Sequence, residues 1–404
     1  MAEKATAGLR NEGALANPKS HLGSVCLLFL RLGATAFGGP AVYIAMMRDE
    51  VVSRRRWLTD GQFLDLLGAT NIIPGPNATE MAIHLGRVRA GWRGLVLSGL
   101  AFTAPATLIT LVFAWAYVRF GSTPELGWVL YGIKPIVICV MVQAIWGLGR
   151  TTVRKPTLLA VGAGVLALYA LGVNEIVLLF GAAAIVMLAA NLRRLVSRSP
   201  VVLPLGLKAA GWSKVAALTA SAGAAGAASF SLSQMFLTFL KIGSLLYGSG
   251  YVLLTFLRAD FVDRLGWLTQ QQLLDAVAAG QVTPGPLLST ATFIGYLLGS
   301  WQGALVATAG VFLPSFLFVA VSGPLLPHVR QWSWTAAFID GVSVAALALM
   351  AGVSWQLARS AIVDPPTVGI AALGALGLLR FGLNSTWLVV LGALIGVAYK
   401  AVAG

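Results

Sequence analysis

Two cations, Arg31 and Lys241, lie inside long apolar runs of this 404-residue chain. A charged side chain at the centre of a bilayer costs at least about 2.5–3.5 kcal/mol on insertion scales, so such residues tend to face a cavity or a partner. Two positive charges near one site would suit an oxyanion. The structural alternative is that both side chains reach back to the membrane surface, since each lies near the start of its run.

Backbone breaks inside the apolar runs are the second group of candidates. They are Phe37-Gly38-Gly39-Pro40 with Tyr247-Gly248-Ser249-Gly250, and Pro74-Gly75-Pro76-Asn77 with Thr283-Pro284-Gly285-Pro286. Proline removes a backbone donor and disfavours helix before it, so helices must stop and restart here. The restarting helices would point positive dipole ends and free N–H groups inward, which predicts a site for a tetrahedral oxyanion. Alternatively, the glycines only let helices cross closely.

Three acidic residues are candidates for carrying a coupling proton: Glu80, Asp65 and Asp275. Glu80 also completes a capping-box pattern with Asn77, which would be a purely structural use. Asp65 and Asp275 lie near helix starts, where the helix dipole favours a carboxylate, so a structural use is favoured for both. Lys134 and Asp340 lie in nearly equivalent runs and could pair.

Enzymatic chemistry finds little support in the sequence. There is no hydrolase triad, zinc-ligand spacing or phosphate-binding loop, and the chain has three histidines. The two cysteines, Cys26 and Cys139, lie in apolar runs, which indicates packing and excludes a disulfide framework. We therefore predict a protein that is not an enzyme and that uses no cofactor or metal.

The composition is that of a polytopic membrane protein. Hydrophobic residues make up 58% of the chain and charged residues 10%, whereas soluble proteins carry about 25% charged residues. The net charge of +14 comes from basic residues scattered over loops, which argues against a nucleic-acid partner and fits loops facing the cytoplasm. The first apolar run is too long for a cleavable signal peptide, so we expect it to remain as an integral segment.

Apolar runs of spanning length form two sets of six. They cover about 22–47, 62–86, 92–118, 128–149, 157–172 and 174–190, and then about 230–257, 271–298, 301–326, 333–356, 366–379 and 384–402. The predicted organisation is an N-terminal tail (1–21), a first transmembrane repeat (22–190), a basic linker with a weak helix at 209–228 (191–229), and a second transmembrane repeat (230–402).

The two sets are copies of each other. At an offset of 210 residues, 18 of the 48 positions from Phe29 to Pro76 are identical, including Trp57-Leu58-Thr59 and its copy Trp267-Leu268-Thr269. The tryptophans read as interface anchors and Thr59 and Thr269 as helix caps. The sequence predicts an all-α membrane protein made of two homologous halves, with broken or re-entrant helices at the Pro-Gly-Pro motifs.

Loop charges favour inverted halves. The first-half loops at 48–61 and 86–93 are strongly basic, whereas their second-half counterparts at 258–264 and 298–302 are balanced or uncharged. Both basic loops can face the same side of the membrane if the Pro-Gly-Pro segment between them is re-entrant, so that it enters the membrane and returns to the side it came from. The weakly basic N-terminus then falls on the unexpected side, unless the first run is also re-entrant, and this point stays open.

The glycine and Pro-Gly-Pro breaks, together with the Trp57-Leu58-Thr59 loop, resemble the chromate ion transporter family across both halves. The resemblance implies a multi-pass protein of the bacterial inner membrane that exports chromate and confers chromate resistance, with two domains of opposite orientation. Tyr247-Gly248-Ser249-Gly250 departs from the first-half motif, so the halves need not contribute equally.

The resulting prediction is a secondary transporter that moves a chromate-like or sulfate-like oxyanion outward, coupled to an ion gradient such as one of protons. Its other partner is membrane lipid, and a homodimer is left open. The rivals are a sulfate or other anion transporter, an anion channel, and a membrane enzyme acting on a lipid-linked substrate. The sequence lacks the cluster of His, Asp and Glu residues that such a membrane enzyme would need.

Overall fold

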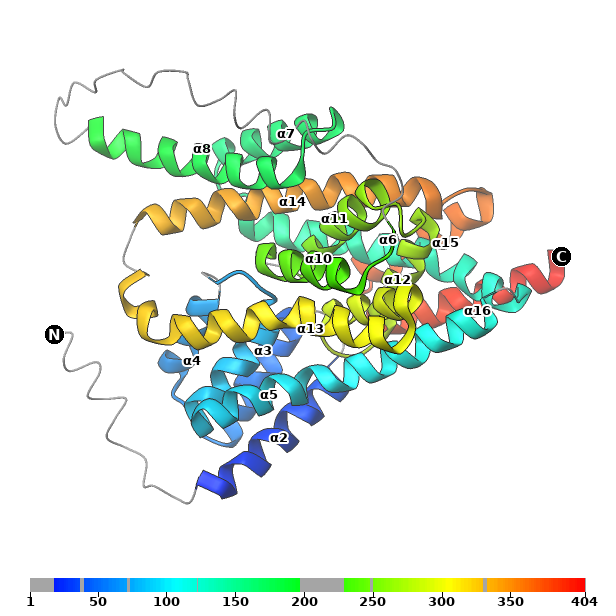
Figure 1. Ribbon diagram of the computed structural model, residues 1–404. Helices are drawn as coiled ribbons and strands as arrows, with labels where there is room; N and C mark the ends of the chain where they lie inside the picture. Colours follow the sequence, from blue (N-terminus) through cyan, green and yellow to red (C-terminus); the bar gives the residue numbers. More distant parts are fainter. Residues whose placement is uncertain are drawn as a thin grey trace.

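The computed structural model describes residues 18–36, 40–70, 73–121, 123–196, 229–247, 250–329 and 333–403, and these ranges contain helices and no strands (Figure 1). The first half contributes α2 (Pro18–Thr35), α3 (Pro40–Arg48), the π-helix η1 (Asp49–Arg54), α4 (Asp60–Thr70), α5 (Asn77–Phe120), α6 (Pro124–Thr152), α7 (Pro156–Ala170) and α8 (Glu175–Val196). The second half contributes α10 (Leu232–Leu245), the 3-10 turn η3 (Gly250–Val252), α11 (Leu253–Leu257), the π-helix η4 (Arg258–Arg264), α12 (Gln270–Val282), the 3-10 turn η5 (Leu287–Ser289), α13 (Thr290–Val329), α14 (Ser333–Ala361), α15 (Pro365–Leu379) and α16 (Ser385–Ala403).

Each half repeats the same order of elements, which confirms two homologous halves. The correspondence includes the short π-helices η1 and η4, which follow α3 and α11. It also includes the predicted caps, since the hydroxyls of Thr59 and Thr269 accept hydrogen bonds from the amides of Gln62 and Gln272. The predicted weak helix at 209–228 and most of the basic linker lie outside the described residues.

The helices break where the glycine and proline motifs predict. Helix α2 ends at Thr35 and α3 starts at Pro40, while α4 ends at Thr70 and α5 starts at Asn77. Helix α4 has 11 residues, a length of roughly 16 Å, against about 30 Å of hydrocarbon in a bilayer. A helix this short cannot cross alone, so its end lies at depth in the protein.

Helices α5 and α13 each contain a sharp reversal, which falls within the loops predicted at 86–93 and 298–302. The backbone leaves helical geometry at Ala90 and Gly91 in α5, and at Gly299 and Ser300 in α13. A Cβ atom built on Gly86 would lie 2.4 Å from the carbonyl oxygen of Gly94, although eight residues of straight helix would separate them by about 12 Å. The two arms of α5 therefore fold back on each other, and the first arm spans only part of a membrane.

Five of the described helices are long and apolar enough to cross a membrane: Asn77–Phe120, Pro124–Thr152, Leu287–Ser322, Trp334–Ala361 and Ser385–Val402. Large apolar side chains on them, such as Trp92, Trp301 and Leu305, are 60–67% exposed. Exposed apolar side chains on spanning helices are suited to contact with lipid. The chain is a multi-pass membrane protein.

The two halves exchange their last two helices. Helices α7 and α8 pack against α14 of the second half, and α15 and α16 pack against α6 of the first (Figure 1). A Cβ atom on Gly132 of α6 would lie 1.8 Å from the carbonyl oxygen of Gly392 in α16. A Cβ atom on the equivalent Gly341 of α14 would lie 2.7 Å from the Cα of Ala183 in α8. Small residues thus allow the backbones to touch at both exchanged contacts.

Candidate functional site

The two Pro-Gly-Pro breaks are tied to the opposite half by a crossed pair of backbone hydrogen bonds. The amide of Gly75 donates to the carbonyl oxygen of Leu246 at 2.5 Å, and the amide of Gly285 donates to the carbonyl oxygen of Ala36 at 3.0 Å. Ala36 and Leu246 are equivalent positions, each directly after the first helix of its half. Each Pro-Gly-Pro break is therefore bonded to the end of the first helix of the other half, and this reciprocal contact is called the crossing below.

Glycine is required at both central positions for two reasons. Gly75 and Gly285 have φ values of +147° and +97°, a region that L side chains rarely adopt. A Cβ atom on Gly285 would also lie 2.9 Å from the Cβ of Ala106 and 3.1 Å from the carbonyl oxygen of Gly33. The predicted close backbone approach is therefore present, between protein segments of the two halves.

First-half side chains hold the second break in place. The Tyr43 hydroxyl donates a 2.7 Å hydrogen bond to the carbonyl oxygen of Gly285. The Thr110 hydroxyl donates to the hydroxyl of Thr283 at 3.2 Å, and Thr283 donates in turn to the carbonyl oxygen of Ala279. The hydroxyl of Thr283, a predicted ligand donor, is thus engaged within the protein. Tyr43 and Thr110 were missed because nothing in their local sequence marks them as contacts of a residue over 170 positions away.

A pocket of about 250 Å³ opens beside the crossing, at the start of α5. Its polar lining consists of Asn77, Thr151, Thr152, Tyr247 and Ser343, and its apolar wall comes largely from α6 and α14. Both halves contribute to this lining, the first half through Asn77 and the second half through Tyr247. The hydroxyl and amide groups can donate hydrogen bonds, and no charged side chain lines the pocket. Of these five residues, the sequence analysis named only Asn77 as a binding residue.

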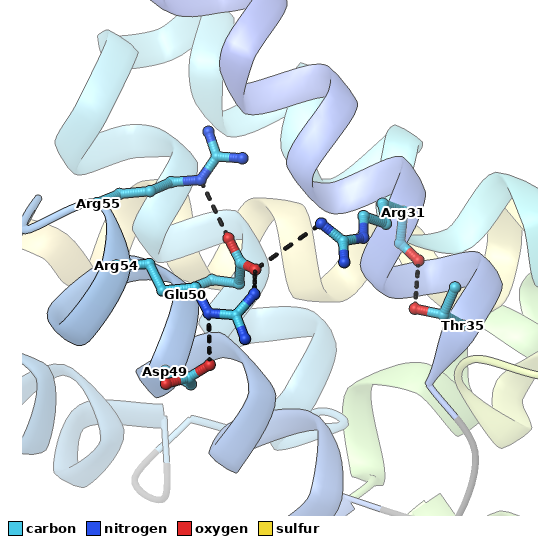
Figure 2. Close-up of polar contacts among 6 residues, drawn as sticks. All are labelled: Arg31, Thr35, Asp49, Glu50, Arg54 and Arg55. Carbon is cyan, nitrogen blue, oxygen red and sulfur yellow. Dashed lines mark hydrogen bonds and ion pairs between the residues drawn. The ribbon is translucent and has the colours of Figure 1, made fainter.

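The predicted cations Arg31 and Lys241 each face an acidic partner in their own half. Arg31 lies 3.9 Å from Glu50, which also pairs with Arg54 at 3.0 Å and Arg55 at 3.2 Å, while Arg54 contacts Asp49 (Figure 2). The ion pair between Arg31 and Glu50 is the longest in this cluster, and 64% of the Arg31 side chain is exposed. It borders a second pocket, of about 200 Å³, together with Thr35, Asp49 and Glu50.

Lys241 repeats this arrangement more tightly. Its ammonium lies 2.5 Å from Asp260, which Arg264 also contacts at 3.0 Å. Arg31 and Lys241 lie five positions before Ala36 and Leu246, roughly 7.5 Å along each helix axis. Glu50 and Asp260 occupy equivalent positions, so a search for duplicated acids near the duplicated cations would have found them.

The three predicted acids have different surroundings. Asp65 is exposed on α4. Asp275 on α12 is buried and pairs with Lys134 at 2.9 Å, and it accepts a hydrogen bond from Tyr117. Lys134 therefore pairs with Asp275 and not with Asp340, because α12 of the second half packs on α6. Glu80 is completely buried.

The capping-box alternative for Asn77 and Glu80 is wrong. Helix α5 begins after Pro76, no side chain caps it, and neither carboxylate oxygen of Glu80 accepts a hydrogen bond from a described residue. The remaining predicted site residues fall into two groups. Pro74, Pro76, Pro284 and Pro286 flank the crossing glycines, Pro40 begins α3 and Gly250 begins η3. Gly38, Gly39, Gly248 and Ser249 lie outside the described residues.

The sequence profile of the chromate transporter family matches residues 23–188 and 233–397, one copy in each half. The chain belongs to the chromate transporter family. It is 35% identical over 388 residues to the chromate transport protein of Cupriavidus metallidurans, covering 95% of this chain and 94% of the relative. It is 31% identical over 394 residues to the probable chromate transport protein of Synechococcus elongatus, covering 95% and 97%.

A chromate transport protein of Pseudomonas aeruginosa is 35% identical over 356 residues, which cover 86% of this chain and 84% of the relative. No solved structure matches the chain.

Proposed function

We propose that this chromate transporter family member exports chromate, a tetrahedral divalent oxyanion, from the bacterial cytoplasm across the inner membrane and so confers chromate resistance. The full-length similarity to chromate transport proteins supports the substrate class. The single observation that carries the proposed site is the crossing of broken helices from both halves beside a pocket lined by hydroxyl and amide groups.

The pocket at the start of α5 is suited to an oxyanion with little formal charge nearby. Thr152, Tyr247, Ser343 and the amide of Asn77 can each donate to an oxyanion oxygen, whereas the Thr151 hydroxyl donates to the carbonyl oxygen of Leu148. The first turn of α5 adds the positive end of a helix dipole, which favours an anion. The glycine breaks at Gly38-Gly39-Pro40 and Gly248-Ser249-Gly250 complete the proposed binding region with Pro74-Gly75-Pro76 and Thr283-Pro284-Gly285-Pro286.

Arg31 and Lys241 are proposed as counter-charges on the path to that pocket. Each would exchange its carboxylate partner for the oxyanion as the substrate passes. Arg31 is better placed for this exchange, because its ion pair with Glu50 is long and Arg54 and Arg55 continue to neutralise Glu50 when Arg31 leaves. Lys241 would give up a much shorter contact with Asp260.

Transport is proposed to proceed by alternating access between two halves of opposite orientation, driven by an ion gradient. The element-by-element repeat and the mutual hydrogen bonds at Gly75 and Gly285 support halves related by a pseudo-two-fold axis. Rocking of one half against the other would open the crossing first to one side and then to the other.

Chromate accumulation in everted membrane vesicles that contain the protein tests the proposal. We expect accumulation that an uncoupler abolishes and that excess sulfate reduces, because sulfate shares the charge and shape of chromate. Vesicles without the protein are the control. Protein-containing vesicles that move no chromate would overturn the substrate assignment, and uptake of sulfate alone would support a sulfate transporter. Conductance that persists without any coupling ion would indicate a channel.

A further inference from the structure

Glu80 is a carboxyl group buried without a partner at the centre of the molecule. Its side chain is in the first turn of α5 and is 0% exposed. Neither oxygen accepts a hydrogen bond, and none of the described lysines or arginines forms an ion pair with it. Its backbone amide bonds to the carbonyl oxygen of Pro76, so the side chain is not needed to start the helix.

An unpartnered ionised carboxylate in such surroundings is very costly, because burial removes its hydration and nothing replaces it. The neutral acid is the form that this environment tolerates. Water-filled space does not relieve the cost, since Glu80 is absent from the lining of the neighbouring pocket although Asn77 is part of it. Glu80 in this conformation therefore holds a proton.

The second half places a hydroxyl group close to this carboxyl. A Cβ atom built on Gly75 would lie 2.1 Å from Oε1 of Glu80 and 2.9 Å from Oγ of Ser315 in α13, so both oxygens border the same point. The Ser315 hydroxyl is also completely buried and without a hydrogen-bond partner. It is positioned to stabilise the carboxylate once the proton has left.

Other titratable groups nearby are few. Tyr247, from the break after α10, lies within electrostatic reach of Glu80, and His84 is one turn further along the same helix and buried. On the neighbouring α2 and α3, Arg31 is engaged with Glu50 and Tyr43 with the carbonyl oxygen of Gly285. The second half has hydroxyl residues, Ser289 and Thr290, in the place of Glu80. Glu80 therefore has no carboxyl counterpart at the equivalent place in the second half.

We propose that Glu80 and Ser315 form a proton site that is linked to the oxyanion pocket, so that proton and oxyanion move in the same direction. This inference rests on the proposed transport function. Asn77 and Tyr247 both line the pocket. Asn77 lies three positions before Glu80, and Tyr247 directly follows Leu246, whose carbonyl oxygen accepts the hydrogen bond from Gly75. A dianion in the pocket would repel a charged Glu80, so each ligand favours the binding of the other. The proton enters from the aqueous side that supplies the oxyanion and leaves where the oxyanion leaves. A divalent oxyanion and one proton together carry one negative charge outward, so a membrane potential that is negative inside, and not an inward proton gradient, would drive this export.

Proteoliposomes that hold the full chain and a pH-sensitive dye test this linkage, with chromate supplied above neutral pH and a membrane potential imposed. Wild-type protein should acidify the lumen in step with chromate uptake. Glu80→Gln, which mimics the neutral acid, should take up chromate without acidification. Glu125→Gln, the same change at an exposed glutamate on α6, is the matched control and should behave like wild type.

Ser315→Ala provides a second readout that leaves the carboxyl in place. Loss of the hydroxyl disfavours the charged carboxylate, so the pH profile of uptake should move to higher pH. Acidification that persists in Glu80→Gln, or lumen alkalinisation by wild type, would overturn the inference and leave chromate transport standing. If Glu80→Gln does not fold, an unmoved profile in Ser315→Ala overturns it. Wild-type vesicles that move no chromate overturn the proposed function and this inference with it.

Discussion

The amide of Gly75 and the carbonyl oxygen of Leu246 lie 2.5 Å apart, although 171 positions separate the two residues in the chain. The equivalent bond from Gly285 to Ala36 makes the contact reciprocal. Movement of one half against the other must therefore stretch or exchange both bonds. The crossing is the place where a conformational change would be communicated between the halves.

Alanine at Gly285 should abolish transport and destabilise the protein. The substitution places a Cβ at a strained φ and against Ala106 and Gly33, and strain of this kind costs about 1–3 kcal/mol. Thermal denaturation in detergent and vesicle uptake would measure the two effects. Gly172→Ala is the control, because Gly172 also has a positive φ of +84° but no atom within 4 Å of the added Cβ. Equal transport by the two variants would contradict the role of the crossing.

Arg31→Gln and Lys241→Gln should both abolish export while the protein stays in the membrane, but only the second should lower thermal stability. Asp260 is buried and keeps only Arg264 when it loses its closest cation, and a hydrogen bond to a charged group is worth about 1.5–3 kcal/mol. Glu50 keeps Arg54 and Arg55 when Arg31 is replaced.

Arg48→Gln is the control for these two variants. Its ion pair with Asp60 is more than half exposed on both sides, and exposed pairs contribute about 1 kcal/mol or less. We expect normal export and nearly unchanged stability. Unchanged export in both Arg31→Gln and Lys241→Gln would remove the two cations from the substrate path.

Removing hydroxyls from the pocket at the start of α5 should weaken substrate binding. Thr152→Val and Ser343→Ala each delete a donor, and a hydrogen bond to a charged group is worth about 1.5–3 kcal/mol, or roughly 10–100-fold in affinity. The concentration of chromate at half-maximal uptake should rise accordingly. Thr157→Val, in a different pocket between α7, α8 and α14, should leave it unchanged. A wild-type value in both pocket variants would place the substrate elsewhere.

Enlarging the exchanged contact between α6 and α16 should destabilise the whole molecule. The Cβ of Gly132→Ala would overlap the carbonyl oxygen of Gly392, and overpacking of this kind costs about 1–3 kcal/mol. Gly127→Ala, earlier in the same helix, has nothing within 4 Å of the new methyl group. A lower melting temperature for Gly132→Ala alone would confirm the contact, and equal melting temperatures would contradict it.

The sequence predicted the features of this fold that have a local cause. Pro-Gly-Pro cannot remain helical, so the breaks at 71–76 and 283–286 followed directly, and the 210-residue offset revealed the repeat. The reversals at Ala90–Gly91 and Gly299–Ser300 fall within the loops predicted at 86–93 and 298–302, because the apolar runs end and restart there. The capping box was predicted from spacing, but the proline before Asn77 starts α5 without a side-chain cap.

Long-range partners left no such local trace. Arg31 and Lys241 were correctly placed as equivalent residues, but their acids Glu50 and Asp260 are brought to them by a helix break followed by a π-helix, which spacing does not predict. The exchange of α7 and α8 for α15 and α16 depends on which apolar faces meet, and those faces look alike in sequence. Nothing in the sequence marks Ser315 as a neighbour of Glu80, and only the structure places its hydroxyl near Gly75.

The exchanged helices have a consequence for how the protein is made. Helix α6 is synthesised before the second half, but α15 and α16, which cover it, leave the ribosome only after α10 to α14. Until then, the surface of α6 around Gly132 is exposed to lipid or to an insertion chaperone. A nascent chain that stops after α14 would leave that surface uncovered, so the first half is fully packed only when α16 has been inserted.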